Sequence, residues 1–586
     1  MHKLLSVALV LALFCFAAPA SAQDAGGLQV GHWVRIKGAW QPDGGFVADS
    51  VEIREPERQE GLIGIVQSAV DDEDDYAVLS VMDQPIMVGL KTQLFGVDAV
   101  GLTDLVGSKI EVDGYWRDGG KFSARELRVR DKGRDRLEGR VDAIRTRDGG
   151  TEIDIMRWTV WLPTGLETIA ERDLSGYTLA EVRGSNADVR ARDDDDEIPG
   201  YALGGGLYGG VRLEWEHTEE HNFDLDDTSR ADRTDDEFPI RGELIYAPGD
   251  EWYGLVGYRH RWLERDEEDN GRFSDSDGRL SEAYVYLRDA GRPGLDLQIG
   301  RQDFDERREW LYDENLDGVR AILRRHTWRF ELAWASILFD GNQRDEETDT
   351  WMFIAESEWS ADWTVGAYAI QRPTSLDGGA DPLHLGLRGY GEFRPNLEGW
   401  AELSWLTGDR NGKDLEGQAF DFGATWYPGD GSPWYWTAGY AFATGDPNPA
   451  DGTDKTYRQT GLQDNNDKFG GVTSFRYYGE LVDPELSNLS VATLGVGRRF
   501  LGRNSIDFVA HHYAQDKALA AWTDSNLDMD PSGLSRDLGW ELDLVLGSRA
   551  RKGIDLELVA GRFFPGDAYP DADGAWLLRL QVRLAP

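Results

Sequence analysis

Cysteine is almost missing from this chain, and the single one, Cys15, lies within residues 1–22. Those residues contain Lys3, an apolar run from Leu4 to Ala18, and Ala20-Ser21-Ala22. This is the pattern of a secretory signal peptide with its cleavage site. We therefore expect a secreted protein whose mature chain has no cysteine. Disulfides and thiolate metal sites are then excluded.

Long apolar runs are missing as well. After residue 22 no stretch approaches the roughly 18 apolar residues that a membrane-spanning helix needs. Basic residues are also few, since 62 Lys and Arg face 107 Asp and Glu, which gives a formal charge of -45. Phosphate binding needs concentrated Lys and Arg, so we expect no nucleic-acid partner. Any membrane role must come from strands.

From Tyr201 to Pro586 the chain repeats one pattern, in which stretches of about ten residues alternate apolar and polar side chains. Leu538–Leu546 and Trp576–Leu584 are clear copies. Successive side chains of a strand point to opposite faces, so each stretch has one apolar face and one polar face. Soluble sandwiches show the same alternation. The recurrence of Arg, Glu and Asp on the polar face, with Trp and Tyr at the strand ends, favours a transmembrane barrel with a wet lumen.

The connections between these stretches give the number of strands. Eight short links alternate with nine long polar links, and seventeen connections join eighteen strands. Outer-membrane barrels have an even number of antiparallel strands and place their short turns in the periplasm. We therefore predict an all-β fold with an 18-stranded antiparallel transmembrane β-barrel over residues 204–586. The strand-like segment 475–481 would break the alternation, so we assign it to the long external loop 445–489.

The N-terminal part of the mature chain contains an internal repeat. Val30–Trp40 matches Val106–Trp116, and the glycine turns and apolar stretches that follow match at an offset of 75 to 76 residues. Short strands and glycine turns predict two tandem small β-barrel or sandwich-like units in the periplasm. We assign them to residues 28–104 and 105–183, and residues 184–203 to an acidic linker.

Charged residues on the polar faces of the strands would line the lumen, because Arg or Lys facing lipid at mid-membrane costs about 2–4 kcal/mol. A guanidinium group takes a carboxylate bidentately and stays charged, which suits a moving polyanion. The alternative is that the charges pair across neighbouring strands and only stiffen the wall. The candidate lumen residues are Arg212, Arg301, Arg320, Arg329, Arg388, Arg579 and Arg583, with acids such as Glu331 on the same face.

Three stretches of this chain resemble the alginate export family of outer-membrane proteins. They are Gly300–Gln302, Arg308–Arg320 and Tyr477–Asn488, and the resemblance covers about 205–584. It implies an 18-stranded channel through which a secreted polyuronate crosses the outer membrane, with an arginine-rich constriction.

The resemblance also implies constriction residues at the matching positions. These are Arg301 and Arg320, with Asp317 as an acidic neighbour. The chain departs from the family in its repeated N-terminal unit, which resembles a small periplasmic domain of unknown function. It also ends Arg583–Pro586, without the terminal aromatic residue that is usual for barrel assembly.

Other motifs argue against metals, cofactors and catalysis. Asp313–Gly318 matches the start of a calcium loop, D-x-N-x-D-G, but Arg324 stands where a bidentate Glu is needed. There is no phosphate-loop motif, and no serine lies in a G-x-S-x-G context. We therefore expect no catalytic residue, no metal site and no cofactor.

The sequence favours passive export of an anionic, alginate-like polysaccharide across the Gram-negative outer membrane. The remaining partners we expect are outer-membrane lipid, lipopolysaccharide and a periplasmic secretion complex that contacts residues 28–170. One alternative is a general or small-solute porin, whose current a polyuronate would not block. Another is an outer-membrane hydrolase or a cell-surface binding protein.

Overall fold

The computed structural model describes residues 33–163 and 200–585. Short gaps within these ranges fall at 42–44, 55–59, 73–75, 90–91, 96–101, 117–121, 131–133, 148–149, 229–231, 249–251, 269–270, 293, 326–327, 338–347, 361–362, 375–378, 395, 429–431, 501–503 and 552. The expected signal peptide and the expected linker up to residue 199 lie outside the described residues. No helix in the described ranges is both long and apolar enough to cross a bilayer.

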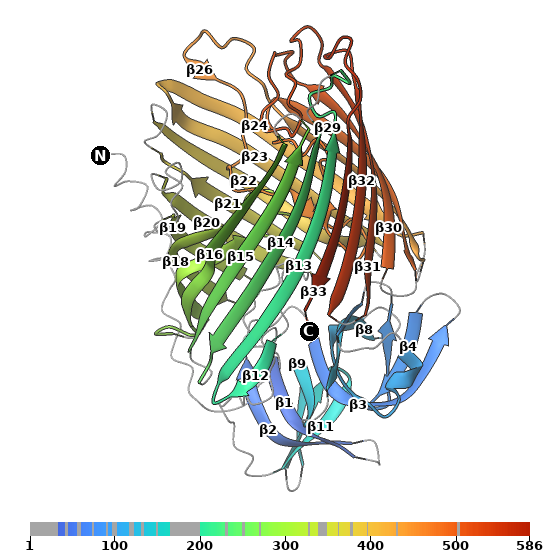
Figure 1. Cartoon of the computed structure of the whole chain (residues 1–586). Coiled ribbons are helices and arrows are strands. Elements are labelled where there is room, and N and C mark those ends of the chain that lie inside the picture. The colour runs from blue at the N-terminus through green and yellow to red at the C-terminus, as the bar shows by residue number, and fades with distance from the viewer. Residues whose placement is uncertain are drawn as a thin grey trace.

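A closed barrel of eighteen antiparallel strands forms the C-terminal part of the molecule (Figure 1). Its strands are β13 (Leu207–His221), β14 (Arg233–Tyr246), β15 (Trp252–Glu267), β16 (Gly271–Leu287), β17 (Leu295–Asp305), β18 (Asp313–Arg325), β19 (Trp328–Ser336), β20 (Thr350–Ser360), β21 (Trp363–Gln371), β22 (Ala380–Arg394), β23 (Leu397–Arg410), β24 (Lys413–Trp426), β25 (Trp434–Ala443), β29 (Leu489–Phe500), β30 (Asn504–Gln515), β31 (Asp537–Arg551), β32 (Ile554–Pro565) and β33 (Trp576–Leu584). Pairing of β13 with β33 closes the barrel. The predicted fold is confirmed.

The connections of the barrel alternate as the sequence predicted. Short links join β14 to β15, β16 to β17 and the later pairs at one end, and long loops lie at the other end (Figure 1). Loop 445–489 connects β25 to β29 and contains the two-residue strands β26 (Thr453–Asp454), β27 (Asn466–Asp467) and β28 (Phe475–Arg476). The segment 475–481 therefore belongs to a loop, as expected. Gly200–Gly204, at the end of the expected linker, forms strand β12, which pairs with β13.

The apolar faces of the strands point outward. Val256 in β15 is 51% exposed and Leu494 in β29 is 66% exposed, although both lie within strands. Exposed aromatic side chains gather beside the short turns, namely Tyr246, Trp252, Trp328, Phe393, Trp426 and Trp434. A soluble sandwich would bury these residues. An outward apolar band with an aromatic girdle is the surface that a bilayer covers.

Two five-stranded barrels form the N-terminal part, and each takes strands from both sequence repeats. The first is built from β1 (Trp33–Trp40), β2 (Phe46–Arg54), β9 (Asp135–Arg147), β10 (Gly150–Ile155) and β11 (Trp158–Pro163). The second is built from β3 (Glu60–Asp72), β4 (Tyr76–Val81), β5 (Gln84–Val88), β7 (Lys109–Trp116) and β8 (Phe122–Arg130), with β6 (Gln93–Phe95) beside β8. The short 3-10 helix η1 spans Leu102–Leu105. Pairing of β1 with β9 closes the first barrel, and pairing of β3 with β7 closes the second.

The repeated glycines explain why the two repeats fold alike. Gly38 and Gly114 occupy equivalent positions, and each lies at a bulge in the pairing with the following strand. A Cβ at either position would lie 2.1 Å from a backbone carbonyl oxygen, of Val47 or of Ser123. The sharp bend of both strands therefore requires glycine.

A buried ion cluster joins the two small barrels. Glu111 in β7 of the second barrel contacts Arg130 in β8 and Arg136 in β9 of the first barrel. Burial alone would raise the pKa of Glu111, but the surrounding guanidinium groups of Arg136, Arg130 and Arg128 lower it to about 2. The carboxylate therefore stays charged and holds cations from both barrels together.

The double barrel lies at the end of the large barrel where the short turns are (Figure 1). Arg125 in β8 contacts the turn between β22 and β23, with Nη2 lying 3.3 Å from Glu392 Oε2 and Nη1 3.8 Å from Glu398 Oε1. The N-terminal part thus stands at the periplasmic mouth of the barrel.

Candidate functional site: the barrel lumen

Several predicted lumen arginines form an ion chain along the wall from β18 to β22. Arg320 donates to both carboxylate oxygens of Glu331, at 2.6 and 3.0 Å. Arg329 contacts Glu331 as well, and its Nη1 lies 3.7 Å from Glu356 Oε2. Arg388 Nε then lies 3.1 Å from Glu356 Oε1, close enough for an ion pair. These charges pair across neighbouring strands, which is the alternative that the sequence analysis left open.

Arg301 and Asp317 form a separate ion pair between β17 and β18. Alternation along β17 places Arg301 on the side of the exposed Ile299, and Asp317 in β18 is on the side of the exposed Val319. Arg301 and Asp317 are themselves only 7% and 5% exposed, much as Arg320 is at 6%, so the lumen position of these two residues stays a prediction. Their side chains are buried, and Arg301 Nη1 donates to Asp317 Oδ2 at 3.4 Å. Because the two charges pair, burial of each costs less free energy than burial of a lone charge would.

Arg579 and Arg583 lie on β33, on the same face as Gln581, which contacts Glu214 of β13. Arg579 Nη2 donates to Glu480 Oε2 at 2.7 Å and to Glu557 Oε1 at 3.4 Å. Arg583 Nε lies 3.9 Å from Glu214 Oε1 on the neighbouring strand β13. Both guanidinium groups stay partly exposed, in contrast to Glu331, which is completely buried.

We call loop 445–489 the plug. It starts at the end of the barrel that carries the long loops and runs inside the barrel to the end that carries the short turns. Its central residues reach the turn between β29 and β30, where Arg499 donates to the carbonyl oxygen of Gly471 at 3.1 Å. The backbone N–H of Val472 donates to Ser505 Oγ at 2.9 Å. Ser505 is the second residue of β30, next to the short turn before that strand. The plug therefore spans the height of the lumen.

The plug packs on the lumen wall through a continuous apolar core. Plug residues Phe475, Tyr477, Leu481 and Val482 are buried together with wall residues of β18 to β21, β23 to β25 and β29 to β33. The lumen face of β19 and β20 is itself apolar there, since it carries Ala333, Ala335, Met352 and Ile354. A wet lumen would leave these side chains in water, so the plug accounts for their presence.

Arg308 fixes the plug to the wall. It belongs to the loop between β17 and β18, and its guanidinium lies between the rings of Trp400 and Tyr477, 4.2 Å from each ring centroid. It donates to Asp421 on β24 at 3.1 Å and to Asp467 of the plug at 3.0 Å. One side chain thus links a loop, the wall and the plug.

Two buried carboxyl groups of the plug have a perturbed pKa. Burial, followed by the Coulombic effect of Asp464 and Glu480, raises the pKa of Asp483 to about 7 against the lowering effect of Arg476. Burial and then Asp524 raise the pKa of Glu485 to about 7. Both groups therefore favour their protonated forms while the plug is in place.

A row of four arginines crosses the lumen face of β13 to β16, and the sequence analysis named only the first of them. Arg212 is directly opposite Arg241, Arg241 opposite Arg259, and Arg259 opposite Arg279. Acids lie beside the row: Glu214 Oε2 is 3.8 Å from Arg212 Nη2, and Glu237 Oε1 is 3.5 Å from Nη1 of Arg261, two residues after Arg259. A sequence signal for part of the row exists. Residues counted in both directions from the short turn at 248–251 pair Arg241 with Arg259.

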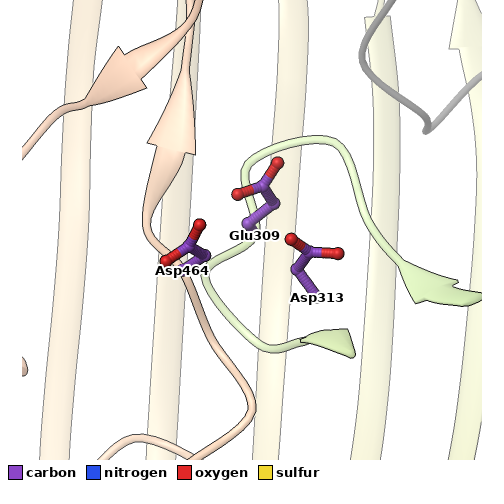
Figure 2. Close-up of side chains that lie close together, drawn as sticks. All are labelled: Glu309, Asp313 and Asp464. Carbon is purple, nitrogen blue, oxygen red and sulfur yellow. The ribbon is translucent and has the colours of Figure 1, made fainter. Parts of the chain in front are cut away.

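Three carboxyl groups converge at the start of β18 (Figure 2). Glu309 belongs to the loop before β18, Asp313 is the first residue of β18, and Asp464 belongs to the plug. One oxygen of each lies within 4.8 Å of the others. The sequence analysis grouped Asp313 with its chain neighbours up to Gly318, but those residues form strand β18. Convergent carboxylates repel one another, and such clusters are common on loops without an ion.

Comparisons with known proteins agree with this geometry. A family model for alginate export matches residues 208–582, and a model for a domain of unknown function matches residues 18–52. The alginate production protein AlgE of Pseudomonas aeruginosa is 25% identical over 384 residues, which is 52% of this chain and 74% of that protein. AlgE of Azotobacter vinelandii is 26% identical over 198 residues, or 29% of this chain and 39% of that protein.

Two solved structures of Pseudomonas aeruginosa proteins align with the barrel part of the chain. OccK11 (OpdR) aligns over 64% of this chain and 95% of that chain, with 14% identity and a TM-score of 0.43. OccK5 (OpdH) aligns over 64% and 97%, with 10% identity and a TM-score of 0.45. The match to the family model extends over almost the whole closed barrel and well over half of the chain. The chain belongs to the alginate export family of outer-membrane β-barrel proteins.

Proposed function

We propose that this outer-membrane channel exports an alginate-like polyuronate passively from the periplasm. The observation that carries the proposal is the row Arg212, Arg241, Arg259 and Arg279 on the lumen face of four adjacent strands. A guanidinium group binds a carboxylate through two parallel N–H donors and remains charged at any physiological pH. A polymer with a carboxylate on each sugar can therefore bind at the row through successive units.

Acidic neighbours keep that binding weak enough for transport. Glu214 competes with the polymer for Arg212, and Glu237, which pairs with Arg261, adds negative charge beside the row. Strong unopposed binding would hold the polymer in place, since conduction requires both entry and release. The driving force is then polymer synthesis and the concentration gradient, because the sequence contains no phosphate-loop motif.

We also propose that the repeats 28–104 and 105–183 act as one periplasmic module. Their position at the mouth of the barrel, supported by the contact of Arg125 with Glu392, would bring a secretion-complex partner next to the entrance. Lipopolysaccharide would surround the other end, where the long acidic loops lie.

Planar bilayer recordings of the full-length protein test the proposal. We expect sodium alginate added on the periplasmic side to block the ionic current, and neutral dextran of equal length to leave it unchanged. Arg259→Ala should raise the alginate concentration for half-maximal block about tenfold or more, because charge-assisted hydrogen bonds are lost. Arg272→Ala is the matched control, since Arg272 is exposed at the far end of β16 and pairs with Asp266. A current that alginate does not change would instead identify a general or small-solute porin.

A further inference from the structure

The ion pair between Arg579 and Glu480 differs in kind from the wall pairs. Arg320 and Glu331 both belong to barrel strands, so their contact joins two parts of one sheet. Arg579 belongs to β33, whereas Glu480 belongs to the plug. The wall thus presents a guanidinium to the lumen, and an acidic side chain from a loop occupies it.

Arg579 also continues the series of arginines along the lumen. Arg583 lies four residues nearer the periplasmic end of β33, beside Glu214 of β13. In the closing pair of strands, Thr218 of β13 is directly opposite Arg579. A polymer that leaves the arginine row at Arg212 on β13 therefore meets Arg583 and then Arg579 on its way outward.

The plug carboxylate has the same chemistry as a uronate. Glu480 offers one oxygen to Arg579 Nη2, and its other oxygen accepts the backbone N–H of Arg476 at 3.2 Å. A uronate carboxylate has the same charge and the same two acceptor oxygens. Replacing one by the other keeps Arg579 paired with a carboxylate, so its guanidinium gains one partner as it loses the other.

We propose that Arg579 is a binding subsite for a uronate carboxylate and that Glu480 occupies it when no polymer is present. The inference rests on the proposed function. Polymer and plug then compete for one guanidinium, and the passing chain displaces Glu480 unit by unit.

The plug keeps its other anchors when Glu480 leaves Arg579. The backbone N–H groups of Leu481 and Val482 donate to Glu541 on β31, at 2.6 and 3.2 Å. The hydroxyl of Tyr513 donates to the carbonyl oxygen of Tyr478 at 2.7 Å. Displacement therefore changes one side chain and leaves the plug in the lumen.

Glu480→Gln is the test, in full-length protein reconstituted in planar bilayers with polygalacturonate as the probe. Because a neutral amide competes less well for the guanidinium, we expect half-maximal block at a concentration about tenfold lower than for the wild type. Asp454→Asn is the matched control, since Asp454 is a plug carboxylate that pairs with Arg458 of the plug itself, at 2.9 Å. It should leave the block unchanged. In the Arg579→Gln variant, adding Glu480→Gln should leave the half-blocking concentration unchanged.

Two results would overturn the proposal: an unchanged half-blocking concentration in Glu480→Gln, or an equal decrease in Asp454→Asn. Heat-modifiable mobility on gels checks that each variant is folded. If Glu480→Gln does not fold, Glu480→Asp serves instead, because its shorter side chain reaches Arg579 less well and should also lower the half-blocking concentration. Failure of polygalacturonate and alginate to block any variant, the wild type included, would contradict the proposed function itself.

Discussion

At the scale of single residues, pairing decides what an arginine in the lumen can do. Arg320 and Arg259 both face inward on barrel strands. Arg320 donates two hydrogen bonds, from Nε and Nη2, to Glu331, which is fully buried. Arg259 stands between two other arginines in the same register. The first arrangement stabilises the wall, and the second attracts anions.

Arg320→Ala should therefore reduce stability and leave polymer binding unchanged. Removal of one partner of a buried pair costs about 3–5 kcal/mol, and contact with Arg329 should keep the loss near the lower end. Urea titration of the protein in detergent micelles measures the stability, and alginate block in bilayers measures binding. Arg259→Ala should instead weaken the alginate block and leave the stability unchanged. A weakened block in a fully stable Arg320→Ala variant would contradict this assignment.

At the scale of structural elements, the plug turns a hollow barrel into a filled one. Eighteen strands enclose a bore too wide for wall side chains to fill. The apolar core shared by the plug and the wall occupies that space, and Arg308 links both to β24. Side chains such as Met352 and Ile354, which face the lumen, are buried because the plug covers them.

Raising the pH from 5 to 8 should loosen the plug. The pKa of Asp483 rises from 3.8 to about 7 and that of Glu485 from 4.5 to about 7 when the plug is in place. Raised pKa values mean that the protonated groups stabilise the seated plug. This contribution is complete below the ordinary carboxyl pKa and is lost as the pH rises through about 7.

Channel current without polymer measures the effect, and it should increase over this pH range. Asp483 faces Arg476, Asp464 and Glu480, and Glu485 faces Asp524 and Arg458. The double variant Asp483→Asn, Glu485→Gln removes both titrating groups, so its current should depend little on pH. An equally steep pH dependence in the double variant would show that other groups control the plug.

At the scale of the whole molecule, three barrels are arranged along one chain. The two small ones exchange strands, so a cut between residues 104 and 105 would separate β3, β4 and β5 from β7 and β8. The ion cluster around Glu111 then joins the two into one module. That module contacts the large barrel through Arg125 at a periplasmic turn.

Arg125→Glu should release the double barrel from the periplasmic turn. The new carboxylate would face Glu392 and Glu398, and like charges at such distances repel. The wild-type pair is partly exposed, so the loss is small, about 1 kcal/mol or less, and high salt should reduce it further. Hydrogen exchange at the turn, where the N–H of Asn396 donates to Glu392, should become faster. The charge exchange Arg125→Glu, Glu398→Arg should restore slow exchange, and no recovery would argue against this contact.

The sequence by itself determined the number of strands, the sites of the short turns and the outward direction of the apolar faces. These features depend on the period-two alternation within a strand and on local turn residues, which can be read along the chain. Only the tertiary structure decided that Arg301 pairs with Asp317, that the two repeats exchange strands, and that residues 445–489 fill the bore. The row from Arg212 to Arg279 also required the register of four strands. Register and long-range contacts join residues far apart in sequence, and no local pattern specifies which partner a charge or a strand edge will find.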